Sequence, residues 1–281
     1  MKFEHTEVFN LEGALRGMRN PLNSWHKADS IFDIFCEHEG YDYADEAADA
    51  WANFKLEKKD FASEEEYDKE YENIYEESRT WLYDNGFHGI GTDHHSCVDF
   101  IGPNDMDLCQ RLGHAGPEHR KYMRQIFISV DITAPLYWWK EADTYKVGTT
   151  ANSTSTMHKL ASTPITLDCF EIGDYDDSLE AFEFIYDSDK TDKMPMGIFV
   201  SDLISDLEAL RQKYNETQDK RYWKELIRWL PNGWLQTRTW TANYEVLRNM
   251  YHQRKNHKLT EWHAFCEWVE SLPYAKELII D

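Results

Sequence analysis

The chain has 281 residues, of which 41% are hydrophobic and 15% aromatic, a composition that supplies a packed core and argues against intrinsic disorder. Its formal net charge of −22 argues against binding DNA or RNA by phosphate neutralisation, although a few arginines could bind a mononucleotide in a local pocket. Because the sequence has no N-terminal signal pattern and no apolar run near ~20 residues, we expect a soluble, cytoplasmic protein without a membrane partner. Five scattered cysteines predict reduced, packed thiols: Cys36, Cys97, Cys109, Cys169 and Cys266.

Two amphipathic helices are predicted between residues 37 and 80, after a turn-rich entry over residues 1–35. Aromatic residues recur there at mostly helical intervals, and Tyr67, Tyr71 and Tyr75 share one face because they are four residues apart. The many acids around them are interpreted as a solvated face. The sharper alternative is a surface that binds a basic protein partner.

A polar, glycine-bearing loop is predicted over residues 86–100. Its adjacent His94 and His95 would point apart on a strand and diverge on a helix, and the sequence offers no placeable third ligand. We therefore expect no metal site. A helix is predicted over residues 101–112, and it delivers His114 to the turn that follows.

Alternating apolar residues predict a strand over 126–132, followed by a helix over 136–140. Residues 148–156, GTTANSTST, are almost all small and uncharged and carry six hydroxyl side chains. Such a run can donate several hydrogen bonds to phosphate oxygens or a sugar, with help from backbone amides. The alternative is a plain Ser/Thr loop without a ligand.

Further along, residues 165–172 predict a strand, and residues 173–193 form an acidic insertion without a motif. Core helices are predicted over 201–214 and 222–230, the first from leucine and isoleucine residues that share one face.

The segment from Leu230 to Arg254 predicts a helix that buries one aromatic stripe. Trp240, Tyr244, Leu247 and Tyr251 recur at spacings of four, three and four. Asn243 and Arg254 are eleven residues apart, close to three turns, so both are expected to project from one line of this helix. A half-buried arginine needs an anion, and one of the chain's own carboxylates is the alternative to a ligand.

This segment resembles the C-terminal motif of the flavin-dependent thymidylate synthases. The resemblance rests on Leu230-Pro231, on Trp240-Thr241 with Asn243 leading into a helix, and on a closing arginine, here Arg254. Arg228 is similar to an arginine that precedes the Leu-Pro pair in that family, and Trp262 lies in a segment that resembles the family's next helix.

A second block resembles the same family. Gly113-His114-Ala115-Gly116-Pro117-Glu118-His119 is similar to its flavin-side motif, shortened by one residue between proline and glutamate. The strand and the Ala134-Pro135 pair that follow match the family's order, and the resemblance covers roughly residues 100 to 275.

The resemblance fails where the family's Arg-His-Arg motif should be. Counted from Ala134-Pro135, that motif falls on Thr144, Tyr145 and Lys146. Lys146 keeps a point charge but not the bidentate guanidinium fork. The serine-rich motif that follows in the family falls on residues 149–156, where its arginine and glutamate are replaced by small or hydroxyl residues.

The resemblance implies a single α/β (α+β) domain with a mixed sheet and helices, in which residues 1–99 are an acidic N-terminal helical section and residues 100–281 are the thymidylate synthase-like core. It also implies a homo-oligomer, a tetramer in that family. The implied reaction transfers a one-carbon unit from a folate to C5 of a pyrimidine deoxynucleotide monophosphate and reduces it with FAD and NADPH. It needs no protein nucleophile.

By resemblance, the nucleotide-binding residues are Glu141, Thr154, Arg228, Asn243, Asn249 and Arg254, and the flavin-side residues are His114, Glu118, His119, Lys146 and Thr149. The family commonly has glutamine at the position of Glu141. A carboxylate only accepts hydrogen bonds, so Glu141 favours a base that presents an amino donor, and dCMP joins dUMP as a candidate substrate.

Two other functions remain open on the sequence. One is a catalytically lapsed nucleotide-binding or regulatory protein that kept the fold and lost the flavin, which the missing Arg-His-Arg supports. The other is a scaffold whose acidic helices bind a basic partner.

Overall fold

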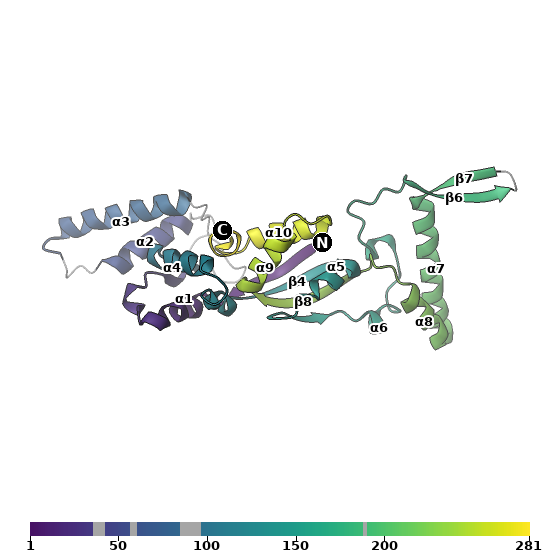
Figure 1. Ribbon diagram of the computed structural model, residues 1–281, viewed down its shortest axis with the longest axis horizontal. Coiled ribbons are helices and arrows are strands. Elements are labelled where there is room, and N and C mark those ends of the chain that lie inside the picture. The colour runs from purple at the N-terminus through teal and green to yellow at the C-terminus, as the bar shows by residue number, and fades with distance from the viewer. Residues whose placement is uncertain (36–42, 57–60, 85–96, 188–189) are drawn as a thin grey trace. The chain divides into compact units, whose positions relative to one another are not determined.

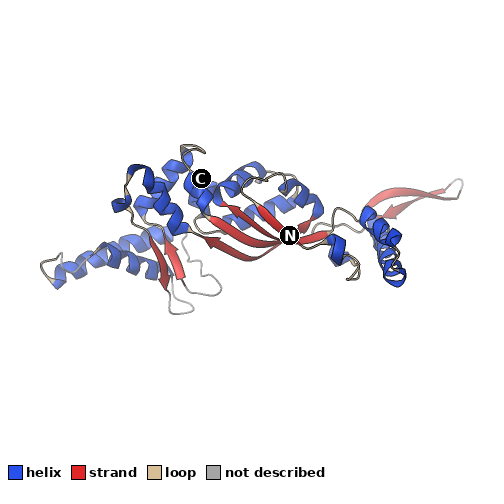
Figure 2. Ribbon diagram, turned by 90° about the horizontal axis from the view of Figure 1, so that it is seen from below, coloured by secondary structure: helices blue, strands red, loops and turns tan. Residues whose placement is uncertain are grey.

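The computed structural model describes residues 1–35, 43–56, 61–84, 97–187 and 190–281. Asp93, His94 and His95 lie outside these ranges, so the expectation about a metal there stays a prediction. The described chain mixes helices and strands, as the α/β prediction requires (Figures 1 and 2). Its contacts form two compact units: unit 1 contains residues 1–6, 129–241 and 257–265, and unit 2 contains residues 7–128, 242–256 and 266–281. The expected division after residue 99 stays a prediction.

A four-stranded sheet has the order β1 (Lys2–Phe9), β4 (Phe127–Pro135), β8 (Leu235–Asn243), β5 (Thr150–Ser153). The predicted strand over 126–132 is confirmed as β4, whose residues 128, 130, 132 and 134 are buried while those between them are less covered. This period of two leaves one face of β4 for the core and one for polar residues. On the polar side, Thr133 and Thr237 of β8 join through their hydroxyl groups at 2.7 Å.

Two sequence predictions about this sheet are wrong. The helix expected within residues 230–254, with Trp240 on its buried stripe, begins only at Tyr244, as α9 (Tyr244–Arg254), because Trp240 belongs to β8. The plain loop, left open as the alternative for the hydroxyl-rich run, is also wrong: the run contains the strand β5, which pairs antiparallel with β8 so that Thr150 lies opposite Thr241. Cross-strand pairing therefore outweighs the helical spacing of the aromatic residues.

In unit 1 the helix α5 (Leu136–Ala142) confirms the helix predicted over 136–140. The predicted helix around Trp262 is confirmed as α10 (Thr260–Glu270). Rings from both helices pack together: Trp138 and Trp262 have centroids 4.9 Å apart, and Phe265 lies 5.4 Å from Trp262. These side chains are almost fully buried.

A helical arm extends from residue 171 to residue 229 of unit 1. It contains the hairpin of β6 (Glu180–Asp187) and β7 (Lys190–Pro195), followed by α7 (Met196–Thr217) and α8 (Lys220–Trp229). The two helices confirm those predicted over 201–214 and 222–230. The strand predicted over 165–172 is wrong: the chain forms a 3₁₀ turn, η5 (Leu167–Cys169), and only Phe170 bridges to Trp234.

Just before the arm, the short α6 (Thr156–Lys159) follows β5. A separate apolar cluster joins this region to α7 and α8, with buried Leu160, Ile165, Phe170, Leu207 and Leu226. Because β-pairing is limited to Phe170, burial of these side chains against two helices is what orders residues 160–170.

Unit 2 is mainly helical. The predicted pair of acidic-section helices is confirmed as α2 (Tyr43–Lys55) and α3 (Glu64–Asp84), and the helix predicted over 101–112 as α4 (Pro103–His114). Along α3 the rings of Tyr67, Tyr71 and Tyr75 follow one another at 6.2 and 6.4 Å, as their spacing predicts. The remaining elements are α1 (Leu11–Arg19), η1 (Asn20–Leu22), η2 (Trp25–Lys27), β2 (Ile31–Phe35), β3 (Cys97–Phe100), η4 (Lys121–Gln125) and η6 (Lys276–Ile280).

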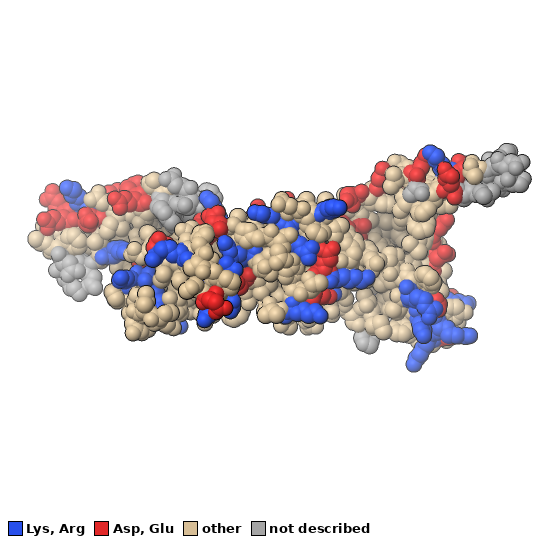
Figure 3. Space-filling view, viewed as in Figure 1, with Lys and Arg blue, Asp and Glu red and all other residues tan. Residues whose placement is uncertain are grey.

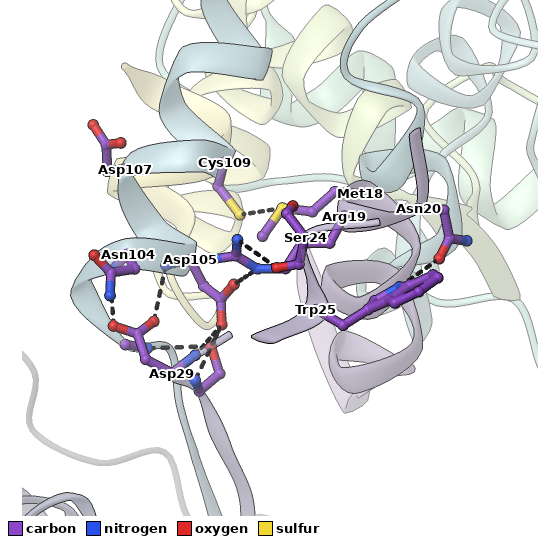
Figure 4. A network of polar contacts seen from close by, with 12 residues as sticks. Met18, Arg19, Asn20, Ser24, Trp25, Asp29, Asn104, Asp105, Asp107 and Cys109 are labelled. Atoms are coloured by element: carbon purple, nitrogen blue, oxygen red, sulfur yellow. Dashed lines mark hydrogen bonds and ion pairs between the residues drawn. The ribbon is translucent and has the colours of Figure 1, made fainter. Parts of the chain in front are cut away.

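A buried polar network fixes the start of α4 (Figure 4). The carboxylate of Asp29 accepts the backbone N–H groups of Asn104 and Asp105 at 2.9 and 3.0 Å, which satisfies two donors of the first helical turn. In return, Asp105 Oδ2 accepts from the backbone N–H groups of Asp29 and Ser30, both at 3.0 Å, and from the Ser30 hydroxyl at 2.6 Å. Asp105 Oδ1 accepts from Arg19 Nε at 2.5 Å. This reciprocal network joins α1, the strand entry at β2 and α4.

Of the helices that the structure describes, none combines the length and the apolar character needed to cross a membrane. Cys109, Cys169 and Cys266 are free thiols, as the scattered spacing predicted. Burial raises the pKa of Cys109 to about 12, so this thiol stays protonated and packs as a small apolar group.

Candidate functional site

Glu141 lies at the edge of the buried aromatic cluster of unit 1, in the last turn of α5. Its Oε2 accepts a hydrogen bond from Trp262 Nε1 at 3.0 Å, and His257 Nε2 lies 3.5 Å from the same oxygen. The Glu141 side chain is 37% exposed, so one side of the carboxylate faces the rings and the other side is reached by solvent. Glu141 therefore presents a fixed hydrogen-bond acceptor beside the packed aromatic rings.

The tautomer of His257 follows from its neighbours. His257 Nδ1 accepts the backbone N–H of Leu259 at 3.2 Å, which leaves Nε2 to carry the proton that points to Glu141. The His257 ring also lies edge-on to Trp262, with centroids 6.2 Å apart. Trp262 Nε1 and His257 Nε2 therefore both lie next to Glu141 Oε2.

Arg238 is a site residue that the sequence interpretation did not single out. Its guanidinium lies 4.2 Å from the ring centroid of Trp139, and Nη1 donates to Asp143 at 2.8 Å. Nε donates to Gln236 Oε1 at 3.0 Å, and Gln236 in turn donates to the carbonyl of Thr154 at 2.8 Å. The alternation of threonines around Arg238, which indicates a strand, was the signal that would have placed it beside α5.

The hydroxyl run is held by a hydrogen bond near each end. Thr149 Oγ1 donates to the Tyr145 carbonyl at 2.6 Å, and the backbone N–H of Thr154 donates to the Thr237 carbonyl at 2.9 Å. Gly148, just before Thr149, has φ +80°, a conformation that favours glycine, and lets the chain turn into β5. Lys146 is exposed, and so is every residue of β5.

Arg228 lies on α8, where it forms an ion pair with Glu225. Arg228 Nη1 donates to Glu225 Oε1 at 2.5 Å, three residues away on the same helix. The guanidinium is half-exposed, so this pair is weak and exchangeable.

Asn243, Asn249 and Arg254 belong to unit 2. Asn243 is the N-cap of α9: its Oδ1 accepts from the backbone N–H of Val246 at 3.0 Å, and its φ of −138° is not helical. The prediction that Asn243 and Arg254 project from one line of a helix is therefore wrong. Asn249 is exposed and accepts from Gln253 Nε2 at 2.8 Å, and Arg254 is half-buried in the last turn of α9.

The flavin-side block forms the turn after α4, also in unit 2. His114, Glu118 and His119 are exposed, and His114 Nδ1 lies 2.7 Å from the Gln110 carbonyl. The residue that holds the turn is one that the sequence interpretation missed: Arg120 donates from Nη1 to the Gly113 carbonyl at 3.2 Å and from Nε to Glu245 at 2.7 Å. The turn thus presents the three predicted side chains outward.

The predicted site residues fall into both units. Unit 1 contains Glu141, Lys146, Thr149, Thr154 and Arg228, and unit 2 contains His114, Glu118, His119, Asn243, Asn249 and Arg254. No cluster of His, Cys, Asp and Glu able to hold a metal occurs within the described ranges.

Comparisons with known proteins give a partial likeness. No family model matches the chain, and no curated protein matches it by sequence. Among solved structures, the flavin-dependent thymidylate synthase ThyX of Helicobacter pylori complexed with FAD and dUMP is 16% identical with a TM-score of 0.44, over 63% of this chain and 83% of that one. A second ThyX structure from Helicobacter pylori, with FAD and dUMP, is 15% identical with a TM-score of 0.45, over 63% and 82%. The UMP/dUMP methylase PolB of Streptomyces cacaoi, bound with 5-Br dUMP, is 14% identical with a TM-score of 0.44, over 64% and 81%. At this level of likeness, the functional argument rests on the residues of the chain itself.

Proposed function

We propose that the protein binds a pyrimidine deoxynucleoside monophosphate, with dCMP preferred over dUMP. In this proposal Glu141 accepts a hydrogen bond from the base. Within unit 1, Arg228 contacts the phosphate and Thr154 supplies a neutral hydrogen-bonding group. The nucleotide-binding roles expected of Asn243, Asn249 and Arg254 in unit 2 stay predictions.

The observation that carries the proposal is the fixed carboxylate of Glu141. Trp262 Nε1 donates to its Oε2, and His257 Nε2 lies 3.5 Å from the same oxygen, so the carboxylate is oriented before a ligand arrives. A carboxylate accepts from the exocyclic amino group of cytosine, whereas the carbonyl at the same position of uracil offers it only another acceptor. An unmatched polar contact of this kind costs about 1–3 kcal/mol, or about 5- to 150-fold in affinity.

Thr144, Tyr145 and Lys146, which stand at the family's Arg-His-Arg positions, cannot bind a flavin as those arginines do. The Thr144 hydroxyl donates to the Glu141 carbonyl at 2.7 Å, and the Tyr145 ring packs edge-on against Trp262 at 6.3 Å. Lys146 is the only cation between residues 144 and 156. A single flexible ammonium cannot reproduce a pair of arginine forks around a diphosphate, so no step of the proposed binding passes through a flavin.

A second candidate function is the family's folate- and NADPH-dependent one-carbon transfer to C5 with FAD. The exposed side chains of His114, Glu118 and His119 on the turn after α4 favour it, because they remain accessible to a ligand or to another subunit of an oligomer. The visible absorbance of the purified protein tests this candidate, before and after FAD is added and the excess removed. A retained flavin band supports one-carbon transfer, and a colourless protein that still binds dCMP leaves nucleotide binding as the function.

The exchange Glu141→Gln tests the proposed function directly. An amide both donates and accepts, so the variant is expected to lose the preference for dCMP and to bind dUMP as well or better. Glu118→Gln, which removes one charge from an exposed residue outside the proposed nucleotide set, is the matched control and should keep the wild-type preference. An unchanged ratio of the dCMP and dUMP dissociation constants in Glu141→Gln would remove Glu141 from the base site.

A further inference from the structure

Large apolar side chains are exposed together where the β6–β7 hairpin joins α7. Leu179 is 55% exposed, Ile198 52%, and Phe182 and Phe199 each 40%. The rings of Phe182 and Phe199 are in contact, with centroids 4.8 Å apart. Single exposed apolar residues are ordinary, but a cluster on one hairpin and helix junction is typical of a surface that contacts another protein.

The same junction is strongly acidic. Residues 171–206 contain eleven acids and two lysines. Asp202 and Asp206 are exposed on α7, four and eight residues after Ile198, so they continue the helix face that Ile198 begins. We call the surface made by Phe182, Ile198, Phe199, Asp202 and Asp206 the acidic patch.

The other end of the arm has the opposite character. Lys220, Lys224 and Arg228 recur every four residues along α8, and Trp229 beside them is 63% exposed. Glu225 accepts from Trp229 Nε1 at 3.0 Å, which holds the indole ring at the surface. We call Lys220, Lys224 and Trp229 the basic patch. Figure 3 shows acidic side chains over β6, β7 and the start of α7, and basic side chains over α8 and the end of α7.

We propose that the arm docks a second copy of this chain head to tail, with the acidic patch of one copy against the basic patch of the next. Each patch offers what the other lacks: exposed aliphatic and aromatic side chains meet an exposed tryptophan, and two carboxylates meet two ammonium groups. The 22-residue α7 is about 33 Å long, and α8 packs back against it, with Leu226 and Leu207 in one buried cluster. Asp202 and Asp206 lie in the first half of α7, whereas Lys220 and Lys224 follow its last turn.

The charges also select this arrangement over a symmetric one. Two acidic patches facing each other would bring like charges together, and so would two basic patches. A heterologous contact satisfies both patches at once and continues from copy to copy unless a ring closes. A second copy is preferred to a foreign basic protein because both complementary surfaces are present on this chain.

Two charge-reversal variants test the contact. Asp202→Lys with Asp206→Lys disables the acidic patch, and Lys220→Glu with Lys224→Glu disables the basic patch; all four side chains are exposed on helices, so folding is not at risk. The wild-type chain is expected to show a concentration-dependent increase in mass in sedimentation velocity, and each variant is expected to lose it. Arg228 stays unchanged because it belongs to the proposed nucleotide set.

The decisive sample is a mixture of the two variants, each with a different fluorophore. One intact acidic patch and one intact basic patch remain, so the mixture should form a mixed pair detectable by energy transfer, and salt should weaken it about tenfold between 0.1 and 1 M. Glu65→Lys with Glu72→Lys on α3 makes the same charge change elsewhere and should associate like the wild type. A wild-type mass independent of concentration, or variants that associate like the wild type, would overturn the proposal. The samples contain no nucleotide or flavin, so this result is independent of the proposed function.

Discussion

Exchange of Asp105 for asparagine is expected to destabilise unit 2 far more than a similar change on the surface of the same helix. Asp105 and its partner Arg19 are 2% and 4% exposed in their side chains. Removing the negative charge leaves the guanidinium buried without its counter-ion. Breaking a buried pair on one side in this way costs about 3–5 kcal/mol.

The second carboxylate oxygen of Asp105 accounts for the rest of the expected loss of stability. Oδ2 accepts three hydrogen bonds, from the backbone N–H groups of Asp29 and Ser30 and from the Ser30 hydroxyl. Asparagine keeps one acceptor oxygen, so it can serve either these three donors or Arg19, but not both. A loss of about 3–5 kcal/mol is therefore expected, a large share of the ~5–15 kcal/mol that stabilises a typical protein.

Urea unfolding followed by tryptophan fluorescence measures this loss. The matched control is Asp107→Asn, two residues along α4, whose side chain is 64% exposed and pairs with Arg111 at 2.8 Å; it should cost less than about 0.5 kcal/mol. Adding Arg19→Met to Asp105→Asn should recover part of the loss, because no buried charge is then left unpaired. Equal midpoints for Asp105→Asn and Asp107→Asn would refute the reasoning.

Three further predictions concern the local structure around the site. Hydrogen bonding from Arg211 lowers the pKa of Glu208 to about 2, so this pair stabilises the fold fully above about pH 4.5 and loses its effect as the pH falls towards 2; Glu208→Gln should flatten the acid side of the stability curve across that window. Asn243→Ala should lower stability by about 1 kcal/mol in thermal unfolding, since it removes the N-cap of α9, whereas Asn243→Asp should retain it. Gly116→Ala should cost about 1–3 kcal/mol because Gly116 has φ +109°, while Gly113→Ala, with no atom within 4 Å of the added carbon, should be tolerated; equal melting temperatures for the two variants would contradict this difference.

The helices were largely predictable from the sequence because their apolar residues repeat with one strong period. The predicted helices at α4, α5, α7, α8 and α10, the two acidic-section helices and the strand β4 are all present. These patterns are local. A stripe of leucines or aromatic residues, or alternation along a strand, can be recognised without knowing which element packs against it.

The misses arise where a partner strand decides the structure. Thr237, Thr239 and Thr241 alternate as a strand should, whereas the aromatic and apolar residues from Trp240 onwards recur at helical spacing. Pairing of β8 with β5 resolves the conflict in favour of the strand. The site was only partly predictable for the same reason. Arg238 and His257 acquire their roles from contacts with Trp139 and Glu141, which no local pattern reveals.

The measurement that tests the central claim most directly is a calorimetric titration of the wild-type protein with dCMP, dUMP and deoxycytidine. The proposed site predicts that dCMP binds at least about fivefold more tightly than dUMP, because Glu141 is a fixed acceptor. It also predicts that deoxycytidine, which lacks the phosphate, binds more weakly than dCMP. Absence of binding by dCMP, or equal affinities for dCMP and deoxycytidine, would contradict the account.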